Sequence, residues 1–445
     1  MKKYFGTDGI RGHIKDEVMS FEFGEKIGRA IVKYCRSCSL KPKIVIARDT
    51  RITGKKLEKA VTDSLLGGGG EVISAEILPT PGLAFLTREL KCSLGLMISA
   101  SHNPADYNGY KFFTAKGEKF SEREELKMEK FILDKKEQDK KIAVKKCVLK
   151  KTGERYLEFL LICLPKDFNL KGDRIVLDCA NGATYRIALK IFRKLGAEII
   201  VIGDKPYGRN INENCGSEHL ERLQKAVKKY KAQAGLAFDG DGDRLRVVDE
   251  KGKILTGDHV LYIIGRMLLE KGELDNKKIV STIMSNIGFV KALENIGVKH
   301  IQTDVGDQKV YDAMKREGAI IGGEESGHII FSKYHTTGDG ILTALMLMQA
   351  FKYFNKNLSV LAKEIKLHPK ILINVPIKSK PPLFSIKPLK EAIGKVEKDL
   401  GTEGRVNVRY SGTEPKCRVM VEGRSKKEVA IMANKIVKVI KNNLS

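Results

Sequence analysis

The sequence predicts an α/β protein with three related α/β domains followed by a small C-terminal α+β domain. Strand and helix signals alternate from the amino terminus to about residue 367, as is typical of α/β units. Three βαβ-like units recur at spacings of roughly a hundred-odd residues. After Pro369 the pattern changes to strands, a proline-containing connection and a closing helix. We therefore expect domains at 1–150, 151–252, 253–367 and 368–445.

Each α/β unit begins with a short apolar run that predicts a buried strand, and a helical pattern follows it. The expected elements are strand 43–47 with helix 57–66, strand 174–178 with helix 185–195 and strand 198–202, and strand 279–283 with helix 289–296 and strand 299–303. In the last domain we expect strands 371–377, 405–410 and 418–422 and a helix over 427–442. The similarity between units is architectural, because no strong residue-by-residue repeat is evident.

The chain has 445 residues and a formal net charge of +26. Its basic residues are scattered and not gathered in one block, so the charge does not indicate a nucleic-acid partner. The eight cysteines form no framework, and the Cys35–Cys38 pair lacks the further ligands of a zinc site, so reduced thiols are expected. There is no apolar signal segment, and the longest apolar run, 341–348, is too short to span a bilayer. We expect a soluble cytoplasmic protein.

Three aspartates, Asp239, Asp241 and Asp243, follow the strand-like run 234–238 and are separated by single glycines. In an extended loop these side chains point the same way, so their charges converge and favour a bound cation. An all-oxygen ligand set is typical of Mg²⁺. An EF-hand would need glycine where Arg244 stands, and helices where strands are predicted. A solvated acidic turn is the other alternative. The pattern predicts a divalent-metal site.

Ser101 follows another apolar run, 94–98, and precedes His102 and Asn103. Alone, this pattern favours a serine that caps a turn, and the G-x-S-x-G elbow of serine hydrolases is absent. The acid loop changes the interpretation, because a phosphorylated Ser101 would offer the metal a fourth oxygen from the protein. We therefore predict that Ser101 carries a phosphoryl group.

Two further loops carry side chains that suit a phosphorylated sugar. Glu324 and Ser326 lie in a glycine-bounded polar loop and suit vicinal hydroxyls, although an ordinary polar turn has the same composition. The second loop offers arginines, hydroxyls and a glycine suited to a phosphate monoester, with a solvated β-turn as the alternative. Its candidate residues are Arg409, Ser411, Gly412, Thr413 and Arg418. Nearer the amino terminus, Arg11 is expected on a glycine-flexed turn, and Lys111 follows shortly after Ser101.

In this order, these segments resemble the α-D-phosphohexomutase superfamily, and within it the branch that acts on glucosamine phosphate. The similarity runs from Tyr4–Gly12 to Arg418–Gly423 and includes Cys179–Thr184 and Thr336–Gly340. The resemblance implies mixed sheets in the α/β domains, four domains around a central cleft, and a mobile phosphate-binding last domain.

The resemblance also implies a role for each candidate residue. Phosphorylated Ser101 and the three aspartates would hold one Mg²⁺, Glu324 and Ser326 would grip the sugar hydroxyls, and the loop at 409–418 would hold the non-reacting phosphate. The candidates near the reacting oxygen are Arg11, Lys111 and His328, together with Arg244 of the acid loop. Lys111 or His328 is expected as general acid–base, and Lys111 would then need a pKa lowered by Arg11 or the metal.

The expected reaction interconverts glucosamine 6-phosphate and glucosamine 1-phosphate through a 1,6-bisphosphate, which also serves as primer. Such a reaction supplies amino-sugar precursors for UDP-N-acetylglucosamine and peptidoglycan. Glucose or mannose phosphates are the alternative substrates, because Glu325 stands where this branch more often has glutamine or asparagine. Gln308 and Lys309 likewise replace a common Arg-Tyr pair. The resemblance implies a phosphosugar as partner and a protein that is often a homodimer, without nucleic acid or membrane.

Overall fold

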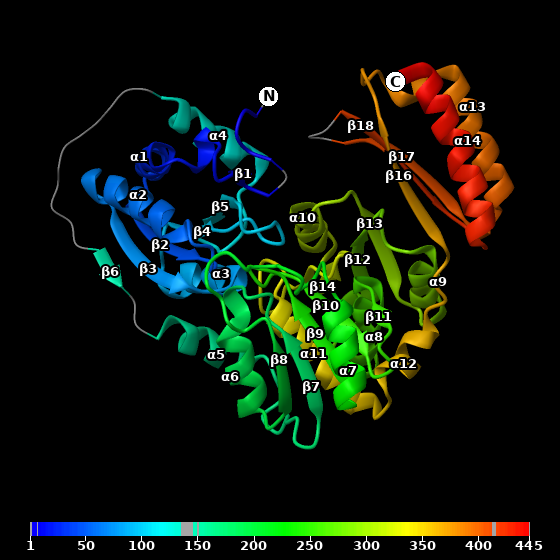
Figure 1. Ribbon diagram of the computed structural model, residues 1–445, viewed down its shortest axis with the longest axis horizontal. Helices are drawn as coiled ribbons and strands as arrows, with labels where there is room; N and C mark the ends of the chain where they lie inside the picture. The colour runs from blue at the N-terminus through cyan, green and yellow to red at the C-terminus, as the bar shows by residue number, and fades with distance from the viewer. Residues whose placement is uncertain (1, 7, 135–145, 149–150, 412–414, 445) are drawn as a thin grey trace. The chain divides into compact units, whose positions relative to one another are not determined.

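The structure is a computed structural model that describes residues 2–6, 8–134, 146–148, 151–411 and 415–444 (Figure 1). The chain divides into two compact units. The first comprises Met1–Ile283 and Lys299–Ala362, and the second comprises Met284–Val298 and Lys363–Ser445. Among the described residues, no helix combines the length and apolar character that a membrane span requires.

The first unit contains three sheets with their helices. The first sheet region has β1 (Ile10–His13), α1 (Phe21–Ser37), β2 (Lys43–Arg48), α2 (Gly54–Gly67), β3 (Glu71–Ile77), α3 (Thr80–Glu89), β4 (Leu94–Ile98), β5 (Tyr107–Thr114), α4 (Glu122–Leu133) and β6 (Lys146–Val148). The second has α5 (Thr152–Ile162), β7 (Arg174–Asp178), α6 (Ile187–Lys194), β8 (Glu198–Ile202), α7 (Glu221–Tyr230), β9 (Ala234–Phe238), β10 (Leu245–Asp249) and β11 (Ile254–Leu255). The third has α8 (Gly257–Glu270), β12 (Lys278–Thr282), β13 (Lys299–Thr303), α10 (Asp307–Glu317), β14 (Ile321–Gly323), β15 (Ile329–Phe331), α11 (Gly340–Phe354) and α12 (Leu358–Leu361).

The three sheets repeat one strand order: β5-β4-β2-β3, β10-β9-β7-β8 and β15-β14-β12-β13. Within each of these sets of four, the strand that comes first along the chain pairs in parallel with the second and with the third. The fourth strand pairs antiparallel with the third. Strands β1, β6 and β11 extend the sheet edges. The prediction of related α/β domains with mixed sheets is therefore confirmed.

This repetition explains why the candidate loops fall where they do. The loops at 99–106, 239–244 and 324–328 each join the third strand of a sheet to its antiparallel partner. Ligand sites of α/β sheets commonly lie at the carboxyl ends of parallel strands. The serine loop, the acid loop and the sugar loop are thus the same structural position in three copies of one arrangement.

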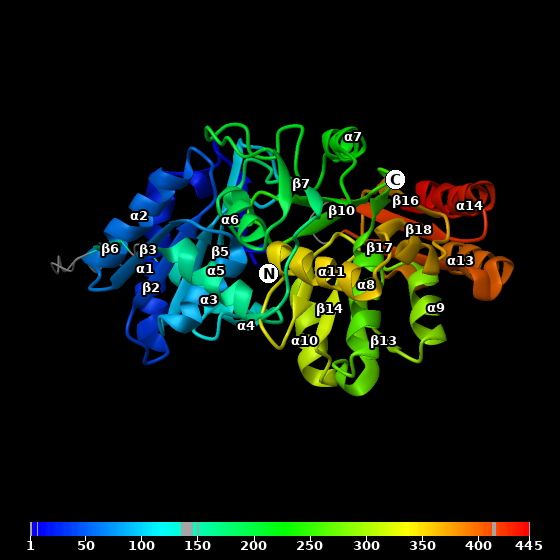
Figure 2. The same cartoon turned by 90° about the horizontal axis from the view of Figure 1, so that it is seen from below.

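Local signals account for how these elements begin and pack. Ser20 caps α1 by accepting the Phe23 N–H at 3.0 Å. Helices α1 and α2 approach closely, because a Cβ added at Gly28 would lie 2.6 Å from the Val61 carbonyl oxygen. In the third sheet region, α8 and α11 lie side by side (Figure 2). Buried aliphatic and aromatic side chains of the sheet and helices form the core of the first region.

The second unit is a small α+β fold. It contains α9 (Ile287–Asn295), β16 (Lys370–Pro376), α13 (Lys387–Leu400), β17 (Arg405–Tyr410), β18 (Lys416–Glu422) and α14 (Lys426–Leu444). Its sheet has the order β16-β18-β17 and is antiparallel throughout. Helices α13 and α14 cover one face of the sheet (Figure 1), and their apolar side chains form the core with those of the strands. The predicted α+β character of this region is confirmed.

The predicted position of Arg11 needs a correction. The glycine-flexed turn ends at Gly9, whose φ is +78°, and Arg11 itself lies on strand β1 opposite Gly109 of β5. Gly109 permits this pairing, since a Cβ there would lie 2.6 Å from the Ile10 carbonyl oxygen. The boundaries predicted near residues 150, 252 and 367 stay predictions.

Candidate active site

The acid loop joins β9 to β10 and brings its three carboxylates together. One oxygen from each of Asp239, Asp241 and Asp243 lies within 4.8 Å of the others, and all three residues are buried. Gly242 allows the tight turn, because its φ is +75° and an added Cβ would meet the Thr184 methyl group at 2.5 Å. The convergence predicted from the alternating spacing is therefore present.

The donor set of this loop fits a hard divalent cation. Within the part of the chain that the structure describes, neither Asp241 Oδ1 nor Asp243 Oδ1 has a hydrogen-bond partner. Burial and the neighbouring carboxylates raise the pKa of Asp239 well above its usual value. A divalent ion would relieve this repulsion and use these oxygens, so the donor set of the loop fits a divalent cation.

Ser101 lies directly beside this site. Its Oγ donates to Asp239 Oδ2 at 2.6 Å, and the residue is 1% exposed. Its backbone has φ +53°, an uncommon conformation for a serine, and its N–H donates to Ser99 Oγ at 2.9 Å. His102 Nδ1 lies 3.4 Å from Ser101 Oγ; burial and the charges of Arg244 and Arg11 lower the pKa of His102 to about 4.

The serine loop is held by two residues that the sequence reasoning did not single out. The buried guanidinium of Arg51 donates to the carbonyls of Ser101 at 3.0 Å and Asn103 at 2.7 Å, and it also pairs with Asp49 at 2.9 Å. Asn212 Nδ2 donates to the same two carbonyls, each at 2.9 Å. The only sequence signal for Arg51 is its place just after the strand at 43–48.

A buried cluster of opposite charges surrounds Lys111. Its Nζ lies 2.7 Å from Asp241 Oδ2, 2.9 Å from Asp8 Oδ2 and 3.4 Å from Asp243 Oδ2. Burial lowers the pKa of Lys111, but the three carboxylates outweigh it and raise the pKa well above its usual value. This direction is opposite to the lowered pKa that the sequence analysis required for a lysine base. The three carboxylates therefore favour the protonated form of Lys111.

Asp8 forms ion pairs with the three basic side chains of this cluster. It accepts from Arg11 at 2.5 Å and from Lys119 at 2.8 Å, in addition to Lys111. Burial raises the pKa of Asp8, but Lys111, Lys119 and Arg11 outweigh it and hold the pKa well below its usual range. Arg11 Nη1 also donates to Asn103 Oδ1 at 3.3 Å, which connects this cluster to the serine loop.

His328 lies beside the same carboxylate oxygen of Asp243 that Lys111 contacts. Its Nδ1 lies 3.7 Å from Asp243 Oδ2, and its Nε2 accepts the Gly338 N–H at 2.9 Å and lies 3.5 Å from Asp307 Oδ2. Burial lowers the pKa of His328, but Asp243 and Asp307 outweigh it and raise the pKa above its usual value. The histidine is thus oriented by one backbone donor and two carboxylates.

Arg244 contacts the acid loop through both its backbone N–H and its charged side chain. Its N–H donates to Asp239 Oδ1 at 3.2 Å, while its guanidinium lies 3.9 Å from both Asp243 and Glu218. Burial lowers the pKa of Arg244, but the charges of Asp243 and Asp239 outweigh the effect of burial and raise the pKa above its usual value. Arg244 therefore balances part of the negative charge of the acid loop.

The sugar loop is anchored by its backbone and leaves polar groups available. Glu324 Oε1 accepts the Gly306 N–H at 3.0 Å, and the buried Ser326 Oγ has no hydrogen-bond partner among the described residues. Gly327 contacts the strand that follows the acid loop, because its carbonyl accepts the Leu245 N–H at 3.0 Å. An unpaired buried hydroxyl is suited to a ligand that brings its own hydrogen-bonding groups.

Two segments that the sequence analysis recorded without a chemical role support the acid loop. In Cys179–Thr184, the Ala183 N–H donates to the Gly240 carbonyl at 2.8 Å. In Thr336–Gly340, the Gly340 N–H donates to the Gly242 carbonyl at 3.0 Å. A Cβ at Gly340 would lie 2.4 Å from the Arg244 carbonyl oxygen, so glycine permits this close approach.

The predicted phosphate loop lies in the second unit. Arg409 and Arg418 are opposite each other on β17 and β18, and an Arg418 Nη2 donates to Ser411 Oγ at 3.3 Å. Lys380 Nζ donates to the Ser411 carbonyl at 2.7 Å, which adds a third cation that the sequence reasoning missed. The predicted residues Gly412 and Thr413 lie outside the described residues.

The acid loop should make the protein's stability depend on a divalent cation. We expect Mg²⁺ at about 100 times its Kd to stabilise the protein by ~2.7 kcal/mol and to raise Tm by a few degrees. Asp241→Asn should remove most of this rise, whereas Asp167→Asn, an exposed aspartate elsewhere in the unit, should keep it. Differential scanning calorimetry with Mg²⁺ and with EDTA measures the effect. Equal Tm values under both conditions would contradict the metal site.

Comparison with known proteins defines the family. Four models of the phosphoglucomutase/phosphomannomutase family match the chain: alpha/beta/alpha domain I at residues 2–139, domain II at 154–252, domain III at 256–367 and the C-terminal domain at 372–439. The chain therefore belongs to the phosphoglucomutase/phosphomannomutase family.

Full-length relatives narrow this assignment. The phosphoglucosamine mutase of Syntrophus aciditrophicus is 45% identical over 448 residues and covers 100% of both chains. That of Bacillus subtilis is 43% identical over 449 residues, covering 100% of this chain and 99% of its own. These relatives confirm the prediction of an isomerase of the phosphoglucosamine mutase group over the neutral-hexose alternative.

Solved structures show the same fold. A phosphoglucomutase/phosphomannomutase family protein from Burkholderia thailandensis superposes with a TM-score of 0.82 at 23% identity, covering 98% of each chain. The N-acetylphosphoglucosamine mutase of Aspergillus fumigatus, in complex with GlcNAc-6P and magnesium, has a TM-score of 0.71 at 17% identity. It covers 99% of this chain and 96% of its own.

Proposed function

We propose that this chain interconverts glucosamine 6-phosphate and glucosamine 1-phosphate by way of a phosphorylated Ser101. The observation that supports the mechanism most directly is the 2.6 Å hydrogen bond from Ser101 Oγ to Asp239, the first carboxylate of the acid loop. The full-length similarity to phosphoglucosamine mutases supports the amino-sugar substrate. In this scheme the serine phosphate passes to the sugar O1, and the 6-phosphate of the resulting 1,6-bisphosphate returns to Ser101.

Three carboxylates are proposed to hold Mg²⁺ together with the serine phosphate: those of Asp239, Asp241 and Asp243. The ion would supply positive charge to the transferring phosphoryl group. The Aspergillus fumigatus relative, solved with magnesium and GlcNAc-6P, supports this choice of ion. Arg244 would balance the remaining charge of the loop, and Arg51 and Asn212 would keep the Ser101 loop in one position.

Proton transfer is proposed to involve Lys111 and His328. A sugar hydroxyl must lose its proton when it accepts the phosphoryl group, and a leaving oxygen must regain one. Lys111 contacts Asp241 and Asp243, and a cation bound to these carboxylates would weaken the charges that raise its pKa and so allow it to donate a proton. His328 is held by Gly338 and Asp243 and is suited to exchange one. Arg11 would neutralise phosphate charge near both residues.

Sugar recognition is proposed for Glu324 and Ser326, whose carboxylate and unpaired hydroxyl suit vicinal hydroxyls. In the second unit, the phosphate that is not transferred is proposed to bind a separate group of residues: Arg409, Ser411, Gly412, Thr413 and Arg418. Two arginines on neighbouring strands suit a phosphate dianion because guanidinium groups bind phosphate oxygens in pairs.

Arg418→Ala tests the phosphate loop. We expect KM for the sugar phosphate to rise by roughly 10-fold or more, because a charge-assisted hydrogen bond contributes about 1.5–3 kcal/mol. The matched control is Arg424→Ala, an exposed arginine just beyond the same strand, which should leave KM unchanged. Steady-state kinetics measure both. An Arg418→Ala protein with unaltered KM and kcat would show that the phosphate binds elsewhere.

Substrate selectivity provides the direct test of the proposed function. With Mg²⁺ and a sugar 1,6-bisphosphate primer, initial rates on glucosamine 6-phosphate should exceed those on glucose and mannose 6-phosphates. The Gln308 and Lys309 side chains pair with Asp312 at 3.4 Å and Asp304 at 2.9 Å, so both are engaged locally. Faster turnover of a neutral hexose phosphate would keep the mechanism and overturn the amino-sugar substrate.

The requirement for Mg²⁺ and for a bisphosphate primer is part of this proposal. So are a cytoplasmic location, a homodimeric state and the lack of a nucleic-acid partner. The seven described cysteines are all free thiols, which is consistent with a reducing compartment.

A further inference from the structure

A cavity of about 500 Å³ lies within the first unit, and one of its lining residues, Ala183, donates its N–H to the Gly240 carbonyl of the acid loop. It is bordered by the end of β2, the start of α2, a bulged part of β3, and the starts of α5 and α6. Figure 1 shows α5 and α6 next to each other below the first sheet. None of the residues proposed for catalysis, metal binding or sugar binding lines this cavity. A volume of this size is in the range of small-molecule sites.

The lining of the cavity is strongly cationic. Five basic and two acidic side chains border it, and the basic ones are Arg48, Lys55, Lys151, Arg186 and Lys190. Within the described part of the chain, Lys55, Arg186 and Lys190 form no ion pair with a carboxylate. All three side chains are exposed, so water and salt screen their charges, and they are available to pair with a bound anion.

Arg48 provides an independent indication, because it is a buried charge with donors to spare. The residue is 6% exposed and lines the cavity. Its Nε donates to Glu58 Oε2 at 3.0 Å, and Glu58 also accepts from Ser74 Oγ at 2.5 Å. Among the described residues, no acceptor binds either terminal nitrogen of Arg48. A buried guanidinium with two such nitrogens is suited to a phosphate group.

The backbone around the cavity adds to the positive electrostatic potential of the cationic side chains. Helices α2, α5 and α6 all begin at its border, and the N-terminal end of a helix carries partial positive charge from unpaired N–H groups. Thr152 and Gly153 of the first turn of α5 both border the cavity. Three helix starts and five cationic side chains thus surround one space.

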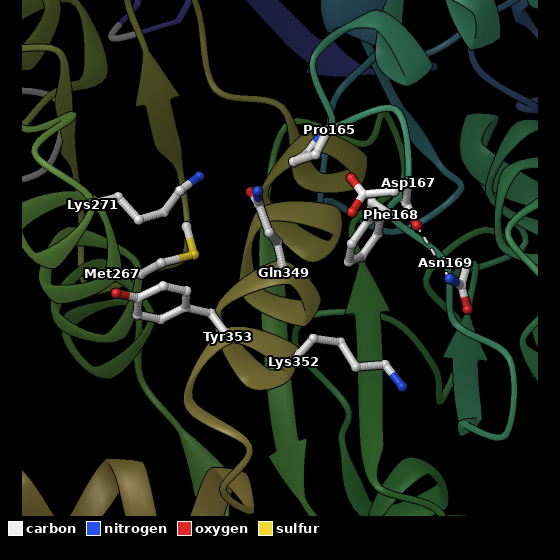
Figure 3. A pocket seen from close by; sticks show the side chains of 9 residues that line it. All are labelled: Pro165, Asp167, Phe168, Asn169, Met267, Lys271, Gln349, Lys352 and Tyr353. Atoms are coloured by element: carbon white, nitrogen blue, oxygen red, sulfur yellow. Dashed lines mark hydrogen bonds between the residues drawn. The ribbon is translucent and has the colours of Figure 1, made fainter.

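A second cavity of similar size makes the contrast clear. Figure 3 shows side chains that line this second cavity, among them Lys271, Lys352 and Asp167. Its volume is about 430 Å³. There, Lys352 is paired with Asp173 at 2.6 Å and Lys271 with Glu273 at 2.7 Å. The cations of that cavity are already neutralised by the protein, whereas most of those around Arg48 are not.

We propose that the cavity around Arg48 is a binding site for a small anion that carries at least two phosphate groups. Two or more phosphates match a lining whose cations come from several elements. The site goes beyond the proposed mutase function, since its residues are separate from those assigned to the reaction. The acidic residues Glu76 and Glu154 at its border would accept hydroxyl or amino groups of the same ligand.

Inorganic pyrophosphate is the probe for this site. The full chain carrying Arg418→Ala is titrated calorimetrically without divalent metal, so that binding to the proposed phosphate loop is weakened. In this background, the double substitution R186A/K190A should weaken pyrophosphate binding by about 10-fold or more. The matched control is R193A/K194A, which removes the same charge from exposed positions at the other end of α6. The control should bind as the parent does.

Hydrogen exchange locates the bound probe. Pyrophosphate should protect amides at the starts of α5 and α6 in the parent and in the R193A/K194A protein, but not in R186A/K190A. Without Arg418→Ala, R186A/K190A should retain normal mutase turnover, which also shows that it is folded. The proposal is overturned if the two double variants bind pyrophosphate equally, if the parent does not bind it, or if protection appears elsewhere.

Discussion

Ser101→Ala is expected to reduce turnover by on the order of 10⁴-fold or more, because alanine has no oxygen to accept and return the phosphoryl group. Binding of glucosamine 6-phosphate should change little, since the proposed sugar and phosphate contacts come from other loops. Turnover assays and calorimetric binding separate these two effects. Loss of the hydrogen bond to Asp239 should cost only about 1 kcal/mol of stability.

A control and a second readout make this test specific. Ser93→Ala removes a hydroxyl that donates to the Lys41 carbonyl just before β4, and it should leave turnover intact. Incubation with a sugar 1,6-bisphosphate should add one phosphate to the Ser93→Ala protein and none to Ser101→Ala, as intact-mass measurement shows. Normal turnover by Ser101→Ala would eliminate the phosphoserine mechanism.

Arg51→Lys is expected to lower kcat by roughly 100-fold, because small displacements of reacting groups have effects of this size. Arg51 donates to four carbonyls: those of Ser101, Asn103 and Pro104 in the serine loop and that of Tyr107 at the start of β5. A lysine has one compact ammonium group and cannot reproduce this planar set of donors. The loop would then lose the contacts that keep Ser101, with its unusual backbone conformation, beside Asp239.

The same substitution should also destabilise the protein by about 1–3 kcal/mol, because lysine keeps a charge beside Asp49 but leaves carbonyls of the serine loop without a donor. Arg405→Lys is the matched control: it disturbs the partly buried ion pair with Glu422 in the second unit and should lower stability with little change in kcat. Asn212→Ala, which removes donors to two of the same carbonyls, should lower kcat by a smaller factor.

A role for Arg51 in positioning predicts that KM changes little and that the rate of Ser101 phosphorylation by the bisphosphate falls together with kcat. If Arg51→Lys lowers stability but leaves kcat and the rate of Ser101 phosphorylation unchanged, Arg51 stabilises the fold and has no role in positioning Ser101.

Much of the fold was predictable because its signals are local. The strands at 94–98, 174–178, 198–202, 234–238, 299–303 and 405–410 were predicted with the bounds that the structure has. Buried parallel strands are short apolar runs, and such runs are visible in a single sequence. The acid loop was equally visible, because alternate spacing of charges on an extended segment has a direct geometric consequence. Helix starts were less exact: α2 begins at Gly54, three residues before the predicted start.

The residues that support the site were not predictable in this way. Arg51 lies far along the chain from the loop that it holds, and Asn212 reaches the same carbonyls from another domain. Neither lies in a segment whose composition differs from an ordinary loop. Their roles depend on which strand ends meet, and that follows from strand order, which one sequence does not specify.

The sequence by itself determined the succession of α/β units, the acid loop and the family, since each depends on residue types at close spacing. Only the tertiary structure decided that three equivalent loops serve different roles, that Arg51 and Asn212 hold Ser101, and that Lys111 is surrounded by Asp8, Asp241 and Asp243. The physical reason is that burial and Coulomb interactions act over distances in space. A pKa direction or a positioned nucleophile therefore depends on neighbours that the chain brings together only when it folds.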